Sequence, residues 1–217
     1  MDNENSITNA ISNDMVSTSL DLGVEYAELG FDELLNDGIL KEIPVIKTLV
    51  SVAKIGFNIK EKFFVKKVLT FLKEFHSGTI SQVKLDEFRN KFNSDYKHRE
   101  KVTEQIMVFL DVYLTNEKSK ILAKLFKAHI EGYYDWEYFQ SLSTCLNSLH
   151  PQSFNYLDRL SQSDFQIPMS PEKVGLSRDF DNEALLDACG ISYKASPWAS
   201  AYQVTKLGQD LFNYGIK

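Results

Sequence analysis

The strongest constraint on this chain is one apolar stretch that also carries many lysines, IPVIKTLVSVAKIGFNIKEKFFVKKVLTFLKEF, from Ile43 to Phe75. On a helical wheel at about 100° per residue, the polar side chains of its first half, apart from Thr48, fall on one narrow stripe: Lys47, Ser51, Lys54 and Asn58. Apolar residues fill the remaining arc, which is wider than the ~100° apolar face of an ordinary surface helix. Such a helix must be covered on most sides.

Three environments can cover this helix. It can be the central helix of a bundle, with its lysines at a solvent-facing seam. It can be a segment that binds or enters an anionic membrane, where each surface lysine contributes about 1 kcal/mol. It can also be a seam between helices of two copies. The candidate membrane or interaction face comprises Lys47, Lys54, Lys60, Lys62, Phe63, Phe64, Lys66 and Lys67.

Charge is distributed unevenly around this stretch. Residues 1–40 contain nine acidic residues and no Lys or Arg, whereas residues 41–74 contain eight lysines and three glutamates. The simplest expectation is that the two regions neutralise each other in the fold. In the membrane interpretation, the acidic region would restrain the basic segment until it is released.

The rest of the sequence predicts a mostly α fold. Hydrophobic residues make up 43% of the chain and charged residues 25%, with ten Gly and five Pro, as expected for a helical globular protein. We predict a disordered polar leader at residues 1–20 and a bundle of about five to seven helices over residues 21–163. Residues 164–217 are predicted to form a connection and a small α+β region.

The chain shows no signature of export or of a membrane span. Its first residues lack the basic start and apolar core of a secretory signal, and no stretch offers the ~20 nearly uncharged residues that a spanning helix needs. Cys145 and Cys189 have no metal-like spacing, which predicts reduced thiols. We therefore expect a cytoplasmic protein, with attachment to the membrane periphery as the alternative.

Catalytic and metal-binding motifs are absent from the sequence. The four histidines, His76, His98, His129 and His150, are scattered, with no HExxH arrangement. No phosphate-binding glycine loop and no GxSxG nucleophile turn occurs. The sequence therefore predicts no cofactor, no metal and no enzymatic activity.

A dense aromatic cluster is the second candidate site. Tyr133, Tyr134, Trp136, Tyr138 and Phe139 lie within seven positions of one another. Such aromatics most often hold helices together, because each buries 150 Å² or more. The alternative is a partner surface formed by Tyr133, Tyr134, Trp136 and Tyr138.

The C-terminal segment AYQVTKLGQDLFNYG, from Ala201 to Gly215, resembles the end of winged-helix domains. In those domains a strand passes into a short final helix, which Thr205 can cap here, and Gly208 allows close backbone packing. The resemblance implies that Asp181–Ala188 would be the DNA-reading helix. Its acidic residues would repel phosphates, so we expect a protein-binding or packing module instead.

The stretch IPVIKTLVSVAK with the basic, aromatic helix after it resembles small bacterial proteins carried by mobile elements and prophages. This resemblance implies a bacterial cytosolic protein and leaves a role in phage–host conflict open, and it assigns no active site. We expect a non-enzymatic protein that acts through protein contacts or self-association. The alternative is an effector that acts on anionic membranes through residues 43–75. Winged-helix DNA binding is a third hypothesis.

Overall fold

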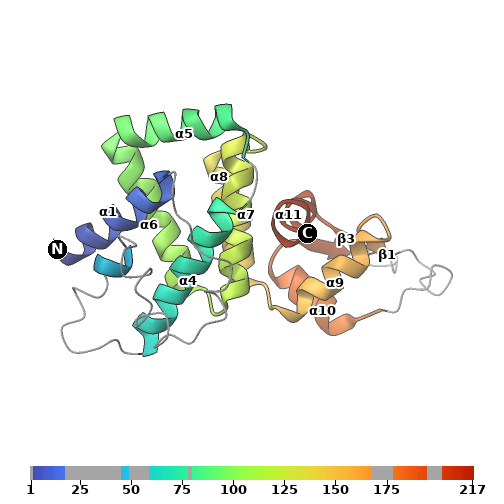
Figure 1. Ribbon diagram of the computed structural model, residues 1–217. Coiled ribbons are helices and arrows are strands. Elements are labelled where there is room, and N and C mark those ends of the chain that lie inside the picture. Colours follow the sequence, from blue (N-terminus) through green and yellow to red (C-terminus); the bar gives the residue numbers. More distant parts are fainter. Residues whose placement is uncertain (1, 18–44, 49–58, 78–79, 168–177, 195–201) are drawn as a thin grey trace. The chain divides into compact units, whose positions relative to one another are not determined.

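The computed structural model describes residues 2–17, 45–48, 59–77, 80–167, 178–194 and 202–217 (Figure 1). The chain separates into two compact units, Met1–Tyr133 and Tyr134–Lys217. Both units are largely helical where they are described, and the second contains a small antiparallel sheet. The predicted fold class, mostly α with a small C-terminal α+β region, is confirmed.

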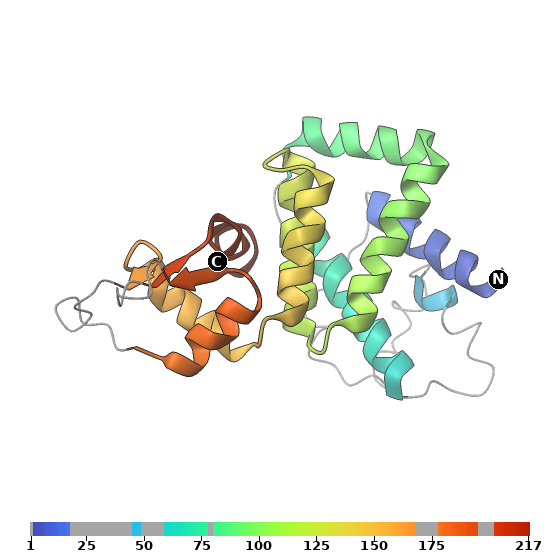
Figure 2. The ribbon, with the colours of Figure 1, turned by 180° about the vertical axis from the view of Figure 1, so that it is seen from behind.

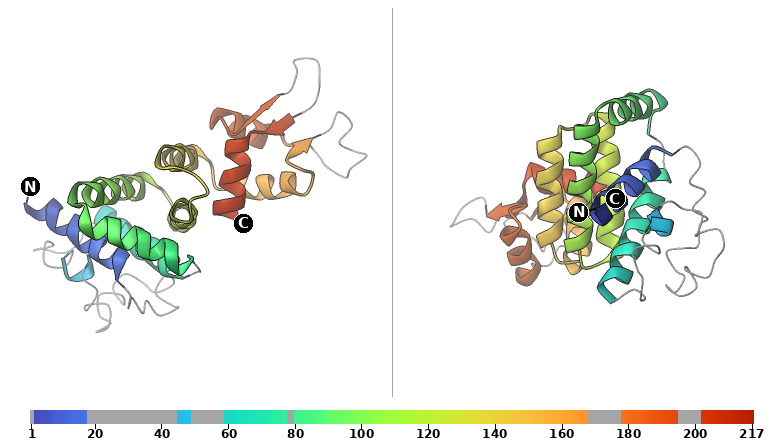
Figure 3. Two further views of the ribbon diagram at one scale, coloured as in Figure 1. Left: turned by 90° about the horizontal axis from the view of Figure 1, so that it is seen from above. Right: turned by 90° about the vertical axis from the view of Figure 1, so that its left-hand side faces the viewer.

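The first unit is built around the contact between two helices. Its helices are α1 (Asp2–Val16), α4 (Ile59–His76), α5 (Gln82–Ser94), α6 (Tyr96–Val112) and α7 (Asn116–Glu131). α4 makes its most extensive contact with α7 and also packs on α6 (Figure 2). α5 contacts both α6 and α7, and α1 lies against α6 and α4 (Figure 3).

Phenylalanines fill the interior between α4, α5 and α7. Phe126 of α7 lies with its ring centroid 5.6 Å from that of Phe75, 5.7 Å from that of Phe88 and 6.3 Å from that of Phe71. Phe71, Phe75 and Phe126 are all buried. The second half of the apolar stretch, from Val65 to Phe75, is thus part of a core. Residues 49–58 of the predicted helix lie outside the described residues.

The N-terminal segment differs from the disordered leader that the sequence predicted for residues 1–20. Residues 2–16 form α1, and Ala10, Ile11 and Met15 are buried. The polar composition of DNENSITNAISNDMV conceals the four-residue spacing of Ile11 and Met15, which places both on one helical face. This face packs on α6 and α4. Residues 18–20 of the predicted leader, and most of the acidic residues expected to face the lysines, lie outside the described part.

Asp14 connects the end of α1 to two other segments. Its Oδ2 accepts a hydrogen bond from the Val45 backbone N–H at 3.1 Å, and its carbonyl oxygen accepts one from His76 Nε2 at 2.9 Å. Burial raises the pKa of the Asp14 carboxyl to about 6, although the Val45 hydrogen bond acts in the opposite direction. Burial also lowers the pKa of His76.

Replacing Asp14 with Asn is expected to stabilise the protein by on the order of 2–3 kcal/mol at about pH 8, and this gain should fall as the pH drops through 6 and vanish only below about pH 4. The folded pKa of about 6 lies above the unfolded value of 3.8, so the wild-type carboxyl adds stability only as the pH falls through 6 toward 4. His76 acts in the opposite sense, because its lowered pKa makes folding less favourable below pH 6.5. Both proteins contain His76, so the difference in urea unfolding isolates Asp14. A pH-independent difference would contradict this assignment.

The second unit combines helices with a three-stranded sheet. Its elements are α8 (Trp136–Ser148), α9 (Gln152–Ser161), β1 (Gln166–Ile167), α10 (Phe180–Ala188), β2 (Ser192–Lys194), β3 (Tyr202–Val204), α11 (Lys206–Leu211) and the π-helical turn η3 (Phe212–Ile216). The strand order is β1-β3-β2, and both pairings are antiparallel. The sequence predicted a boundary near residue 164, whereas the second unit begins at Tyr134. Helices α8 and α9 belong to the second unit, because α8 contacts α11 and α9 contacts α10.

The junction between β3 and α11 follows the local prediction. The Thr205 hydroxyl accepts a hydrogen bond from the Gly208 N–H at 3.2 Å and so caps α11. A Cβ atom on Gly208 would lie 2.5 Å from both the Ile191 carbonyl oxygen and the Val204 Cγ1 atom. Glycine is therefore required where α11 packs closely against Ile191 and Val204.

Candidate functional site

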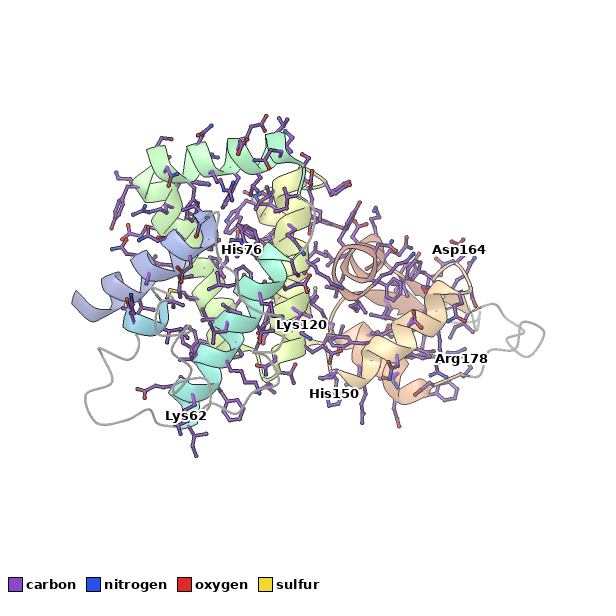
Figure 4. All side chains as sticks on the ribbon, in the orientation of Figure 1. Lys62, His76, Lys120, His150, Asp164 and Arg178 are labelled. Atoms are coloured by element: carbon purple, nitrogen blue, oxygen red, sulfur yellow. The ribbon has the colours of Figure 1, made fainter. Side chains whose placement is uncertain are left out.

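The start of α4 presents a stripe in which exposed apolar side chains alternate with half-buried lysines. Ile59, Lys62, Phe63 and Lys66 recur at i, i+3, i+4 and i+7, so they share one helical face, and we call this set the α4 stripe. Ile59 is 74% exposed and Phe63 is 59% exposed. Figure 4 places Lys62 at the end of α4 that lies away from His76. The opposite face of the helix is buried in the core.

The other predicted members of this face occupy different environments. Lys60 borders the α4 stripe, and its Nζ lies 3.3 Å from Asp111 Oδ2 of α6 in an exposed ion pair. Phe64 is half-buried and Lys47 is exposed, whereas Lys54 lies outside the described residues. The structure therefore gathers part of the predicted face into one surface.

The prediction that Lys67 belongs to this face is wrong, because its side chain is buried. Only 6% of it is exposed, and its Nζ donates to the Asp111 carbonyl at 2.9 Å and to the Tyr113 carbonyl at 2.8 Å. These carbonyls lie at the C-terminal end of α6, where helices lack internal donors. Burial lowers the pKa of Lys67, an effect that Asp111 opposes. Lys67 therefore caps α6 from α4.

A second exposed stripe lies on α10 in the other unit. Phe180, Asp181, Ala184, Leu185 and Ala188 are all exposed and follow one side of the helix, and we call this set the α10 stripe. Phe180 is 69% exposed and Leu185 is 38% exposed. α10 contains no Lys or Arg. Its exposed face is therefore apolar with an acidic margin.

A buried ion pair anchors α10 on its inner side. Glu183 is buried, and its Oε1 accepts hydrogen bonds from Arg178 Nε at 2.6 Å and from the Tyr156 hydroxyl at 3.1 Å. Arg178 Nη2 also donates to Glu183 Oε2. The Arg178 guanidinium lies 5.1 Å from the centroid of the Phe180 ring, within cation–π range. The anchor thus also supports one end of the α10 stripe.

The predicted aromatic partner surface is divided between the two units. Tyr133 belongs to the first unit and is exposed, whereas Tyr134, Trp136 and Tyr138 belong to the second and are half-buried. The Tyr134 ring packs against Tyr138 at 5.5 Å and against Tyr214 at 5.6 Å.

Tyr138 has a defined partner inside the second unit. Its hydroxyl donates to Asp210 Oδ2 at 2.9 Å. The pKa of Tyr138 is raised to about 12, mainly by burial and to a smaller extent by this hydrogen bond. Tyr134 and Tyr138 therefore pack within the second unit, in the helix-joining role that the sequence offered as one alternative.

One histidine and one cysteine donate hydrogen bonds to backbone carbonyl groups. His76 binds the Asp14 carbonyl, and the Cys145 thiol donates to the Cys189 carbonyl at 3.2 Å. Across the described ranges, no three His, Cys, Asp or Glu side chains are grouped to hold a metal ion. Within those same ranges, no helix has the length and apolar character needed to cross a membrane.

Comparison of the chain with family models, with curated proteins and with solved structures finds no match. Its function must therefore be inferred from its own surfaces. The sequence indicated the α4 stripe through its lysines and phenylalanines. The sequence did not indicate the α10 stripe, because the acidic residues of that helix predicted a polar surface, whereas Phe180 and Leu185 are exposed there.

Proposed function

We propose that this protein acts by binding another protein, without catalysing a reaction, and that the α4 stripe is its contact surface. One observation carries the proposal. Ile59 and Phe63 are exposed to solvent beside Lys62 and Lys66, on a helix whose opposite face is buried. Exposed aromatic and aliphatic side chains flanked by charge are typical of protein contact surfaces. The lysines favour an acidic partner.

The α10 stripe supports protein binding over DNA binding. In the winged-helix resemblance, α10 would be the helix that enters the DNA groove. Its exposed side carries Asp181 with Phe180 and Leu185, and it offers no basic side chain to a phosphate. Since phosphate contacts dominate affinity for DNA, a helix of this composition is poorly suited to the role.

The variant Lys62→Glu/Phe63→Ser/Lys66→Glu is expected to lose its protein partner. Two charge reversals and one lost aromatic contact should weaken binding by at least about tenfold. The measurement is quantitative mass spectrometry of proteins that copurify with the tagged chain from the organism that encodes it. A matched control, Lys97→Glu/Lys101→Glu/Val108→Ser, changes three exposed residues of α6 in the same way and should keep the partner. Equal partner recovery from both variants would refute the proposal.

Binding to an anionic membrane is the second candidate function, and the same stripe motivates it. Exposed Ile59 and Phe63 could enter the interface while Lys62 and Lys66 face anionic headgroups. Flotation with anionic and with neutral vesicles separates the two functions. Recovery of the wild type with anionic vesicles, lost in the stripe variant, would favour the membrane. Deleting residues 18–40, which removes six acidic residues and keeps α1, should then increase recovery. The bacterial setting, which the resemblance implied, and the role in phage–host conflict, which it left open, stay predictions.

A further inference from the structure

The two exposed stripes are complementary in charge and similar in length. The α4 stripe spans residues 59–66 and places two lysines among apolar side chains, and the α10 stripe spans residues 180–188 and places Asp181 beside apolar side chains. At 1.5 Å per residue, each stripe is roughly 12 Å long. Each therefore offers about two helical turns of apolar surface with an opposite charge.

We infer that the partner of the α4 stripe is the α10 stripe of a second copy of this chain. This inference rests on the proposed function, because it requires the α4 stripe to be a protein contact surface. Phe63 and Ile59 would pack against Phe180 and Leu185, and Lys66 or Lys62 would meet Asp181. Opposite charges across such a contact set its orientation and raise its rate of formation.

Charge favours a second copy as the occupant. Residues 134–217 contain ten acidic and six basic side chains, whereas α4 contains five lysines and two glutamates. The chain therefore supplies both an acidic unit and a basic helix. Because the contact joins different surfaces of two copies, it is heterologous, and each added copy presents a further free stripe unless the assembly closes into a ring.

A charge-swap experiment tests the inference on the full chain. One variant, Lys62→Glu/Lys66→Glu, makes the α4 stripe acidic. The other, Asp181→Lys/Ala188→Lys, makes the α10 stripe basic and leaves Asp187 intact, because Asp187 accepts a hydrogen bond from Ser192. The control, Lys97→Glu/Lys101→Glu, reverses two exposed lysines on α6. Sedimentation velocity gives the mass of each protein, and circular dichroism checks that each is folded.

The wild type is expected to exceed its monomer mass of 24.9 kDa as concentration rises at low salt, and to dissociate as salt increases. Each stripe variant alone should be monomeric, with association weakened at least tenfold. An equimolar mixture of the two should associate again, because their stripes are complementary across chains. The control should associate like the wild type.

Three outcomes would overturn the inference: a wild type that stays monomeric at all concentrations, a mixture of folded variants that stays monomeric, or a control that dissociates like the stripe variants. The proposed function can survive each of them. A monomeric wild type that loses a copurifying protein on mutation of the α4 stripe would keep the contact surface and assign it to a different partner.

Discussion

Replacing Phe126 with Ala is expected to lower the free energy of unfolding of the first unit by about 3–5 kcal/mol. Phe126 is buried, and its ring contacts Phe71 and Phe75 of α4 and Phe88 of α5. Its removal would leave a cavity at the contact that holds α4 against α7. Domains are typically stable by only 5–15 kcal/mol, so this loss would remove a large part of the total.

Urea unfolding followed by circular dichroism measures this effect as a loss of helix at lower urea, and tryptophan fluorescence, which arises from residues 134–217, separates it from unfolding of the second unit. Val108→Ala is the control, since Val108 is exposed on α6 and its truncation should change stability by less than about 0.5 kcal/mol. A Phe126→Ala protein as stable as the control would show that the phenylalanine cluster does not hold the first unit together. The same loss would release α4 and so disorganise the α4 stripe.

Replacing Glu183 with Ala is expected to cost the second unit about 3–5 kcal/mol. The change removes the carboxylate that pairs with Arg178 and accepts from Tyr156, and it leaves a largely buried guanidinium without its counter-charge. Asp181→Ala, two positions away on the exposed side of the same helix, is the control and should cost less than about 1 kcal/mol.

Tryptophan fluorescence reports this change selectively. Both tryptophans, Trp136 and Trp198, belong to residues 134–217, whereas the first unit contains none. Glu183→Ala should therefore move the fluorescence transition to lower urea. Equal midpoints for Glu183→Ala and Asp181→Ala would contradict the assignment of Glu183 as the anchor of α10. Loss of that anchor would also disturb the α10 stripe, since Phe180 packs beneath the Arg178 guanidinium.

Local signals in the sequence predicted much of this fold. Apolar periodicity indicated the helices, and Gly132 ends α7 in a left-handed conformation with φ of 88°. At its other end, α7 is capped by Thr115, whose hydroxyl accepts a hydrogen bond from the Lys118 N–H. Thr205 caps α11 and Gly208 allows close backbone packing, as their chemistry predicted.

Other features depend on contacts between distant residues, which sequence patterns do not contain. α1 is polar in composition, and its helix is covered only because Ile11 and Met15 meet α4 and α6. Lys67 lies within a basic run, which predicts a surface residue. The carbonyls at the end of α6 that bind it are more than forty positions away in the sequence, so the local pattern does not indicate its burial. The exposure of Phe180 likewise depends on which side of α10 the Glu183 anchor turns inward.

The buried ammonium of Lys67 also gives the protein an internal reporter of its own opening. Acylating reagents attack amines that water can reach, so exposed Lys60 would be labelled whether or not α4 and α6 are in contact. Lys67 would be labelled only in molecules in which those helices have separated. The ratio of acylated Lys67 to acylated Lys60 would therefore measure how often α4 and α6 separate, and it requires no substitution in the chain.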